Sequence, residues 1–93
     1  MQEYGTKQLA ITQVATATTA GGTQVVGANG TRRRLILKNC DASITIYIGI
    51  GTVTSTNCVP LLAGESISLE TTAAIKALSA SGTPQLAYVE EYN

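Results

Sequence analysis

The side chains that could do chemistry are few in this chain of 93 residues, and histidine is absent altogether. Without histidine, no Ser-His-Asp or Cys-His system can activate a nucleophile, and ordinary histidine-ligated zinc or iron sites are excluded. The two cysteines cannot complete a structural zinc site by themselves. A metal-dependent cupin, another kind of small β-barrel, is excluded because the chain has no histidine to bind the metal.

The acidic side chains are the remaining candidates for general acid or base catalysis. A glycosidase-like pair needs two carboxylates that converge across the fold. Glu90 and Glu91 are adjacent in an expected strand, so they point to opposite faces; Glu65 with Glu70 is more simply solvated surface. The six carboxylates are those of Glu3, Asp41, Glu65, Glu70, Glu90 and Glu91. We therefore expect no enzyme: no catalytic residue, metal, cofactor or small-molecule substrate, with a small hydrolase as the least favoured function.

The two cysteines, Cys40 and Cys58, could be reduced or paired. In a chain that is not secreted, the default is two reduced thiols that behave as small hydrophobic side chains. A disulfide would require the turn after residues 32–39 to meet the segment before Pro60, and spacing alone does not decide this. Both alternatives stay open at this point.

The basic side chains gather in one cluster, Arg32, Arg33 and Arg34, which holds half of the six basic residues. In a strand, Arg32 and Arg34 share one face, and Arg33 lies on the other beside Leu35. Guanidinium groups suit carboxylates or phosphates of a partner. The simpler interpretation is a solvated start of a strand that discourages edge pairing. We predict partner contacts at these three arginines and at the polar segment 1–7.

The charged side chains and cysteines must be positioned by β-strands, because the chain has strand periodicity, which is clearest in residues 31–51. Ile44, Ile46, Ile48 and Ile50 alternate with smaller or polar residues, a period of two that is typical of a half-buried strand. We expect this isoleucine face to be core. The strand is expected to form a hairpin with residues 32–39, and Asn29-Gly30 predicts a type I′ hairpin between residues 23–28 and 32–39.

The whole chain divides into about eight short strands, with turn residues about every ten positions. The expected strands cover residues 8–14, 23–28, 32–39, 44–50, 58–62, 66–70, 73–80 and 84–91, and Pro60 limits the fifth to a sheet edge. Such spacing predicts one all-β domain over residues 1–93, an antiparallel β-sandwich or jelly-roll-like barrel, with 1–7 as an extended arm. The alternative for residues 70–80 is a helix of three turns.

The composition bears on partners and location. The core must be aliphatic, because the chain has no Trp or Phe and four Tyr. Charged residues make up 13% of the chain, against about 25% in ordinary soluble domains, so we expect partner subunits to cover much of the surface. A net charge of zero argues against nucleic acid or an acidic membrane as partner. Residues 1–8 are polar and include no apolar region, so we expect no signal peptide, and no apolar run is long enough to span a membrane.

The order of several short motifs adds a resemblance to these expectations. From Asn29 to Tyr92 the chain resembles small virion proteins of tailed bacteriophages. The motifs are RRLILKN at 33–39, IYIG at 46–49, VTSTN at 53–57, PLLAGE at 60–65 and YVEEY at 88–92. Cys58 departs from the pattern, since a turn glycine is expected there. The resemblance implies a β-sandwich or jelly-roll module, commonly trimeric, that serves as capsid cement or as part of a head fibre or tail structure.

These lines together predict a non-enzymatic structural protein of a phage virion. The favoured role is a homotrimeric capsid decoration (cement) protein, made in the cytoplasm of the host. Its partners would be itself and the major capsid protein or another virion protein. The alternative is a host-receptor or carbohydrate-binding module of a head or tail fibre, which would need Tyr47 and Tyr88 to be accessible.

Overall fold

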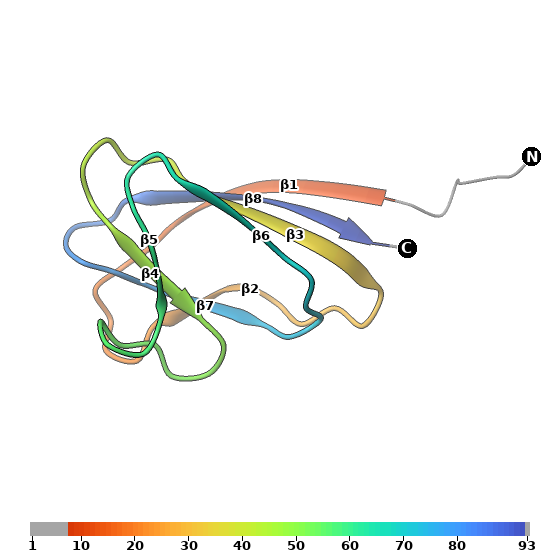
Figure 1. Ribbon diagram of the computed structural model, residues 1–93, viewed down its shortest axis with the longest axis horizontal. Helices are drawn as coiled ribbons and strands as arrows, with labels where there is room; N and C mark the ends of the chain where they lie inside the picture. The colour runs from red at the N-terminus through yellow and green to blue at the C-terminus, as the bar shows by residue number, and fades with distance from the viewer. Residues whose placement is uncertain (1–7, 93) are drawn as a thin grey trace, which may run out of the picture.

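Eight strands make up the fold in the computed structural model, which describes residues 8–92 and, within them, side chains from Ile11 onward (Figure 1). The predicted arm, 1–7, lies outside the described residues. The strands are β1 (Gln8–Ala15), β2 (Thr23–Val26), β3 (Arg32–Asn39), β4 (Ile46–Gly49), β5 (Val59–Leu61), β6 (Ser66–Leu69), β7 (Ile75–Ser79) and β8 (Gln85–Tyr92). The helical alternative for residues 70–80 is wrong, because they contain β7. Within residues 8–92 we find no helix with the length and hydrophobicity that a membrane crossing needs.

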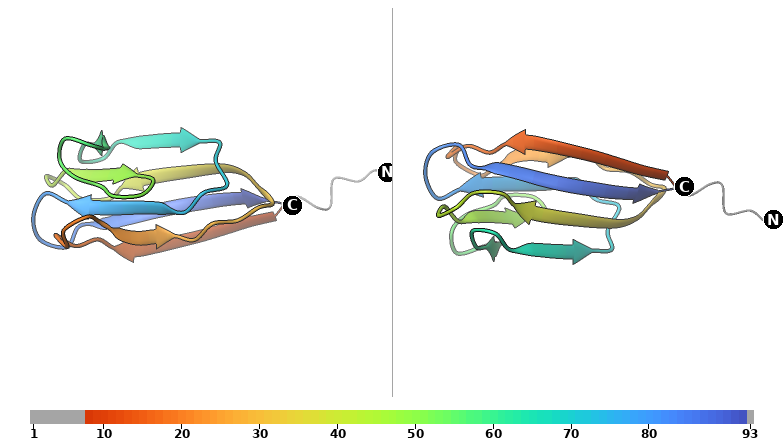
Figure 2. Two further views of the ribbon diagram at one scale, coloured as in Figure 1. Left: turned by 90° about the horizontal axis from the view of Figure 1, so that it is seen from below. Right: turned by 90° about the horizontal axis from the view of Figure 1, so that it is seen from above.

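The strands form two four-stranded sheets that face each other as a sandwich (Figure 2). The first sheet has the order β1-β8-β3-β6 and the second the order β2-β7-β4-β5. Every pairing between neighbouring strands is antiparallel. Consecutive strands alternate between the sheets, as in a jelly roll, except β4 and β5, which pair with each other in the second sheet. The predicted all-β sandwich is therefore confirmed, and β5, with Pro60, lies at a sheet edge as expected.

Neither predicted hairpin forms, because the chain crosses between the sheets at both places. Strand β2 pairs with β7, whereas β3 pairs with β6 and β8, and β4 belongs to the second sheet. Asn29 and Gly30 do not have the positive φ that a type I′ turn requires. Instead, the Asn29 side-chain oxygen accepts a hydrogen bond from the Thr31 amide at 3.0 Å, and the Asn29 carbonyl accepts one from the Arg32 amide at 3.1 Å. Asparagine favours such turns because its side chain bonds the backbone two residues on.

The second crossing, from β3 to β4, is fixed by one buried amide. The Asn39 side-chain nitrogen donates to the carbonyls of Ile44, at 2.7 Å, and Leu61, at 2.9 Å. Its oxygen accepts from the Asp41 amide at 2.9 Å. Because a buried polar group must find partners, Asn39 holds the turn of residues 40–45 against β5.

The core between the sheets is aliphatic. Fully buried side chains come from both sheets: Val26, Leu35, Leu37, Ile46, Ile48, Leu61, Ile75, Ala77 and Leu86. Of the predicted isoleucine face, Ile46 and Ile48 are core and Ile44 is half-buried. Ile50 is 61% exposed, so the expectation was wrong there. The reason is that β4 ends at Gly49, and the chain turns away at Gly51, where φ is +80°.

Candidate functional site

The space between the sheets is packed and offers no reactive group. The inward positions of β3 and β4 are occupied by Leu35, Leu37, Ile46 and Ile48. Over residues 8–92, no three side chains of His, Cys, Asp or Glu stand close enough together to hold a metal ion.

One charged group does enter the sandwich: the side chain of Arg32, which has no exposed surface. Its Nε donates to a carboxylate oxygen of Glu90 at 2.9 Å. One terminal nitrogen donates to the carbonyls of Thr71, at 2.8 Å, and Ala73, at 2.9 Å, and the other donates to the carbonyl of Gly27. The guanidinium thus ties β3 to β8 and to the loops before β3 and before β7. A partner cannot reach it, so Arg32 is not part of an exposed arginine cluster.

A β-bulge explains why Arg32 turns inward. The register between β3 and β8 shifts between Arg32 and Arg34, and Arg34 lies opposite Glu91. The extra residue places Arg32 on the same inner side as Leu35 and leaves both Arg33 and Arg34 exposed. The expectation that Arg33 shares a face with Leu35 is therefore wrong, since it assumed unbroken alternation.

The two exposed arginines border a polar hollow of about 290 Å³. It is lined by Arg33, Arg34, Glu70 and Glu91. The Arg34 Nε lies 3.6 Å from a carboxylate oxygen of Glu91. Two positive and two negative side chains balance, so the hollow suits a partner surface of mixed charge better than a free anion.

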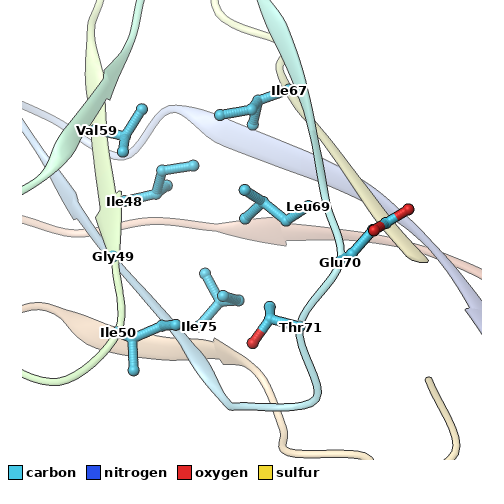
Figure 3. A pocket seen from close by; sticks show the side chains of 9 residues that line it. All are labelled: Ile48, Gly49, Ile50, Val59, Ile67, Leu69, Glu70, Thr71 and Ile75. Atoms are coloured by element: carbon cyan, nitrogen blue, oxygen red, sulfur yellow. The ribbon is translucent and has the colours of Figure 1, made fainter. Parts of the chain in front are cut away.

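A second hollow, of about 280 Å³, opens between β5 and β6 and is apolar (Figure 3). It exists because β5 and β6 are edge strands of their sheets, and no strand closes the sandwich between them. Ile67 and Leu69 reach from β6 toward Ile48 and Val59, while the carboxylate of Glu70 points away. This hollow was not expected from the sequence, although the alternation in β6 and the proline in β5 indicate two edge strands.

The remaining polar candidates are structural. Asp41 caps the turn after β3: its carboxylate accepts hydrogen bonds from the amides of Ser43, at 2.9 Å, and Ile44, at 2.8 Å. These backbone bonds lower the pKa of Asp41 below its usual 3.8. Both Cys40 and Cys58 are free thiols, so the disulfide alternative does not occur.

The two tyrosines that a carbohydrate site would need do not share a surface. Tyr88 lies on the inner side of the first sheet and packs against the core. Tyr47 is half-buried on β4 of the second sheet. Sugar recognition through this pair is not favoured by their placement.

Comparison with solved structures identifies the architecture. Hydroxypropylphosphonic acid epoxidase from S. wedmorenis is 17% identical, with a TM-score of 0.55 over 91% of this chain and 43% of its own. A chain from the disulfide-linked pili of Bacillus endospore appendages is 17% identical, with a TM-score of 0.53, over 94% of this chain and 86% of its own. A cupin-2 domain protein from Shewanella frigidimarina is 16% identical, with a TM-score of 0.51, over 96% and 74%. The fold is a cupin-like jelly roll.

These likenesses establish the fold alone. No protein-family model and no curated protein sequence matches the chain. The chain spans less than half of the epoxidase, and the neighbours include both an enzyme and a pilus protein. They say nothing of a phage particle, so that part of the expectation remains a proposal.

The metal chemistry of the epoxidase does not transfer to this chain. Structures of that enzyme hold iron(II) or cobalt(II). Here histidine is absent, and the inward positions of the central strands are mostly aliphatic. The buried Arg32 and Asn39 side chains are bound to Glu90 and to backbone carbonyls. These residues do not fit a metal centre inside the jelly roll, because aliphatic side chains supply no ligand atoms and no three His, Cys, Asp or Glu side chains gather within residues 8–92.

Proposed function

We propose that the chain is a non-enzymatic structural protein of a phage virion, a capsid decoration (cement) protein that stabilises the head as an oligomer. The observation that carries this proposal is the contrast between interior and surface. The interior is aliphatic, and its one charged side chain, that of Arg32, is bound by groups of the same chain. Large hydrophobic side chains are instead exposed, among them Ile11, Ile50 and Leu62. Exposed apolar surface of this kind is typical of association.

The phage assignment within this proposal rests on the order of motifs from RRLILKN to YVEEY. The low proportion of charged residues also favours a surface that partners cover. A structural role is open to this fold, since a chain of the same architecture comes from endospore pili. The same resemblance implies a trimer.

The mechanism would be bridging of neighbouring shell subunits. A protein that binds only the assembled shell stabilises it by a free energy that grows with the logarithm of the ratio of its concentration to its dissociation constant. Arg33 and Arg34 are the exposed members of the predicted arginine contact, and the segment 1–7 is the second predicted contact. Their partners would be carboxylates of the major capsid protein or another virion protein.

Electron microscopy of phage particles, with a gold-labelled antibody against this chain, tests the proposal. We expect regular labelling of the heads and heads that withstand higher temperatures when the chain is present. Labelling confined to fibres or tails would favour the host-recognition alternative. Particles that never carry the chain would refute a virion role.

A further inference from the structure

Three hydrophobic side chains form a row across the outer face of the first sheet. Ile11 of β1 lies opposite Val89 of β8, and Val89 lies opposite Ile36 of β3. Ile11 is 76% exposed and Ile36 is 36% exposed, whereas Val89 is half-buried. The row continues on β6 at Ser68, opposite Ile36. Since neighbouring strands are about 4.8 Å apart, the three side chains extend over about 10 Å.

Charged residues flank this row unequally. On one side, two residues further along the strands, Arg34 lies opposite Glu91. On the other side, Lys38 lies opposite Ala87. One flank is therefore a pair of opposite charges on the two central strands, and the other carries a single positive charge.

We propose that this face binds the same face of a second copy, about a two-fold axis parallel to the strands and midway between β8 and β3. The inference deepens the proposed function and rests on its oligomeric part. Such an axis exchanges β8 with β3, so Val89 of one copy covers Ile36 of the other. It also places Arg34 of each copy over Glu91 of the other, twice in the dimer.

Charge complementarity selects a second copy and this axis. A two-fold axis along the row would instead place Arg34 over Lys38, which brings like charges together. The axis parallel to the strands avoids that contact and pairs Arg34 with Glu91. Because the interface is isologous, the same residues act on both copies, and a separate threefold contact elsewhere on the chain is not precluded.

The area available sets the strength of the contact. Strands β1, β3 and β8 have eight residues each, and the edge strand β6 has four, so the face covers about 440 Å² per copy. The total of about 900 Å² is below the size of standard interfaces and in the range of weak, transient contacts. We therefore expect a dimer that dissociates on dilution.

The decisive experiment mixes two charge-reversed variants, Arg34→Glu and Glu91→Arg, in sedimentation equilibrium. The full-length chain should dimerise as its concentration rises. Each variant alone should dimerise at least tenfold more weakly, because like charges then face each other. An equimolar mixture should recover dimers, since an acidic face meets a basic one. Mixing cannot repair the pair within each chain, so recovery reports a contact between copies. Lys76→Glu, a charge reversal on the second sheet, is the matched control.

Substitutions of exposed isoleucines test whether the dimer forms through this face or through the apolar hollow. Ile36→Lys should abolish the dimer, because Ile36 faces Val89 of the other copy, and Ile50→Lys should leave it intact. The proposal is overturned if the chain is monomeric at all concentrations, if the mixture fails to recover dimers, or if only Ile50→Lys dissociates them. A dimer that survives Ile36→Lys also overturns it. Head binding is measured separately: a monomer that binds heads refutes this interface alone, and a dimer absent from particles refutes the proposed function alone.

Discussion

The core borders solvent at two places, the end of the sandwich around Arg32 and the edge between β5 and β6. A buried ion pair closes the first place, and the second stays open and apolar. At both places the two sheets separate and the core could meet water. Around Arg32, one guanidinium binds a carboxylate and three carbonyls, and its side chain has no exposed surface. Between β5 and β6, no polar group closes the gap, and Ile67 and Leu69 border an open hollow.

This difference predicts that the Arg32 end contributes to the stability of the fold, whereas the β5–β6 edge is available for association. A buried charge with all its partners present resists any change, because the loss of one partner leaves the others unsatisfied. An apolar edge tolerates change in the free protein, since its side chains already contact water. We therefore expect substitutions at the Arg32 end to affect folding and those at the open edge to leave it largely intact.

The largest effect is expected from Arg32→Met. The substitution keeps much of the side-chain length but removes the positive partner of the Glu90 carboxylate, which has 15% of its side-chain surface exposed and keeps a hydrogen bond from the Asn29 side-chain nitrogen at 3.2 Å. Removal of one partner of a buried ion pair costs about 3–5 kcal/mol of unfolding free energy. Urea denaturation followed by circular dichroism measures this loss. Arg33→Met, one residue along and exposed, is the control and should change stability by less than about 0.5 kcal/mol. Equal effects at the two positions would contradict the comparison.

A comparison of two leucines sharpens the contrast between closed core and open edge. Leu37 is fully buried on β3, and Leu69 is half-buried beside the hollow on β6. Leu37→Ala should cost about 2–5 kcal/mol, because it removes buried methylenes and leaves a cavity. Leu69→Ala should cost less by about 1–3 kcal/mol, since solvent can fill the space that it leaves. Urea midpoints of the two variants at a constant m-value give this difference; equal losses would mean that the hollow is closed in solution.

Much of the fold could be predicted from the sequence, because strand periodicity and turn residues are local signals. All eight strands were expected close to their observed bounds, and Pro60 marked an edge. Which strands pair could not be predicted in the same way. The turns at residues 27–31 and 40–45 look like hairpin turns, but both lead from one sheet to the other. Hydrophobic alternation is the same in either case, since both sheets bury one face.

The candidate site was predicted less well, because one extra residue in β3, the bulge between Arg32 and Arg34, reverses which face of the sheet the preceding side chain points to. The Arg32 bulge depends on β8, which is about sixty positions away in the chain, and strict alternation from Leu35 gives the wrong face for Arg32 and Arg33. The apolar hollow depends on two edge strands from different sheets. Neither feature is encoded in a short stretch of sequence, so only the assembled sandwich reveals them.

A smaller effect is expected from Ile50→Thr, at the open edge. Ile50 and Ile46 belong to the same alternating run, but Ile50 lies beyond the end of β4 and Ile46 is fully buried. Ile50→Thr should change the unfolding free energy by less than about 0.5 kcal/mol, as is usual for exposed sites. Ile46→Thr, the matched control, should cost well over about 2 kcal/mol, because it buries a hydroxyl and removes a packed methyl group. Thermal unfolding of both variants distinguishes the exposed from the enclosed isoleucine, and similar losses would place Ile50 in the core.

The smallest effect is expected at Asp41, which is hydrogen-bonded like Arg32 but open to solvent like the β5–β6 edge. Backbone bonds from Ser43 and Ile44 lower its pKa below 3.8 in the folded protein. The unfolded chain thus binds a proton more readily, so Asp41 stabilises the fold above about pH 4 and loses this contribution as the pH falls through its lowered pKa. Asp41→Asn removes the charge and keeps an acceptor oxygen. The wild-type protein should therefore be the more stable of the two at pH 6, and the difference should shrink on acidification toward pH 2. A difference that stays constant over this range would show that the turn depends on its hydrogen bonds and not on the carboxylate charge.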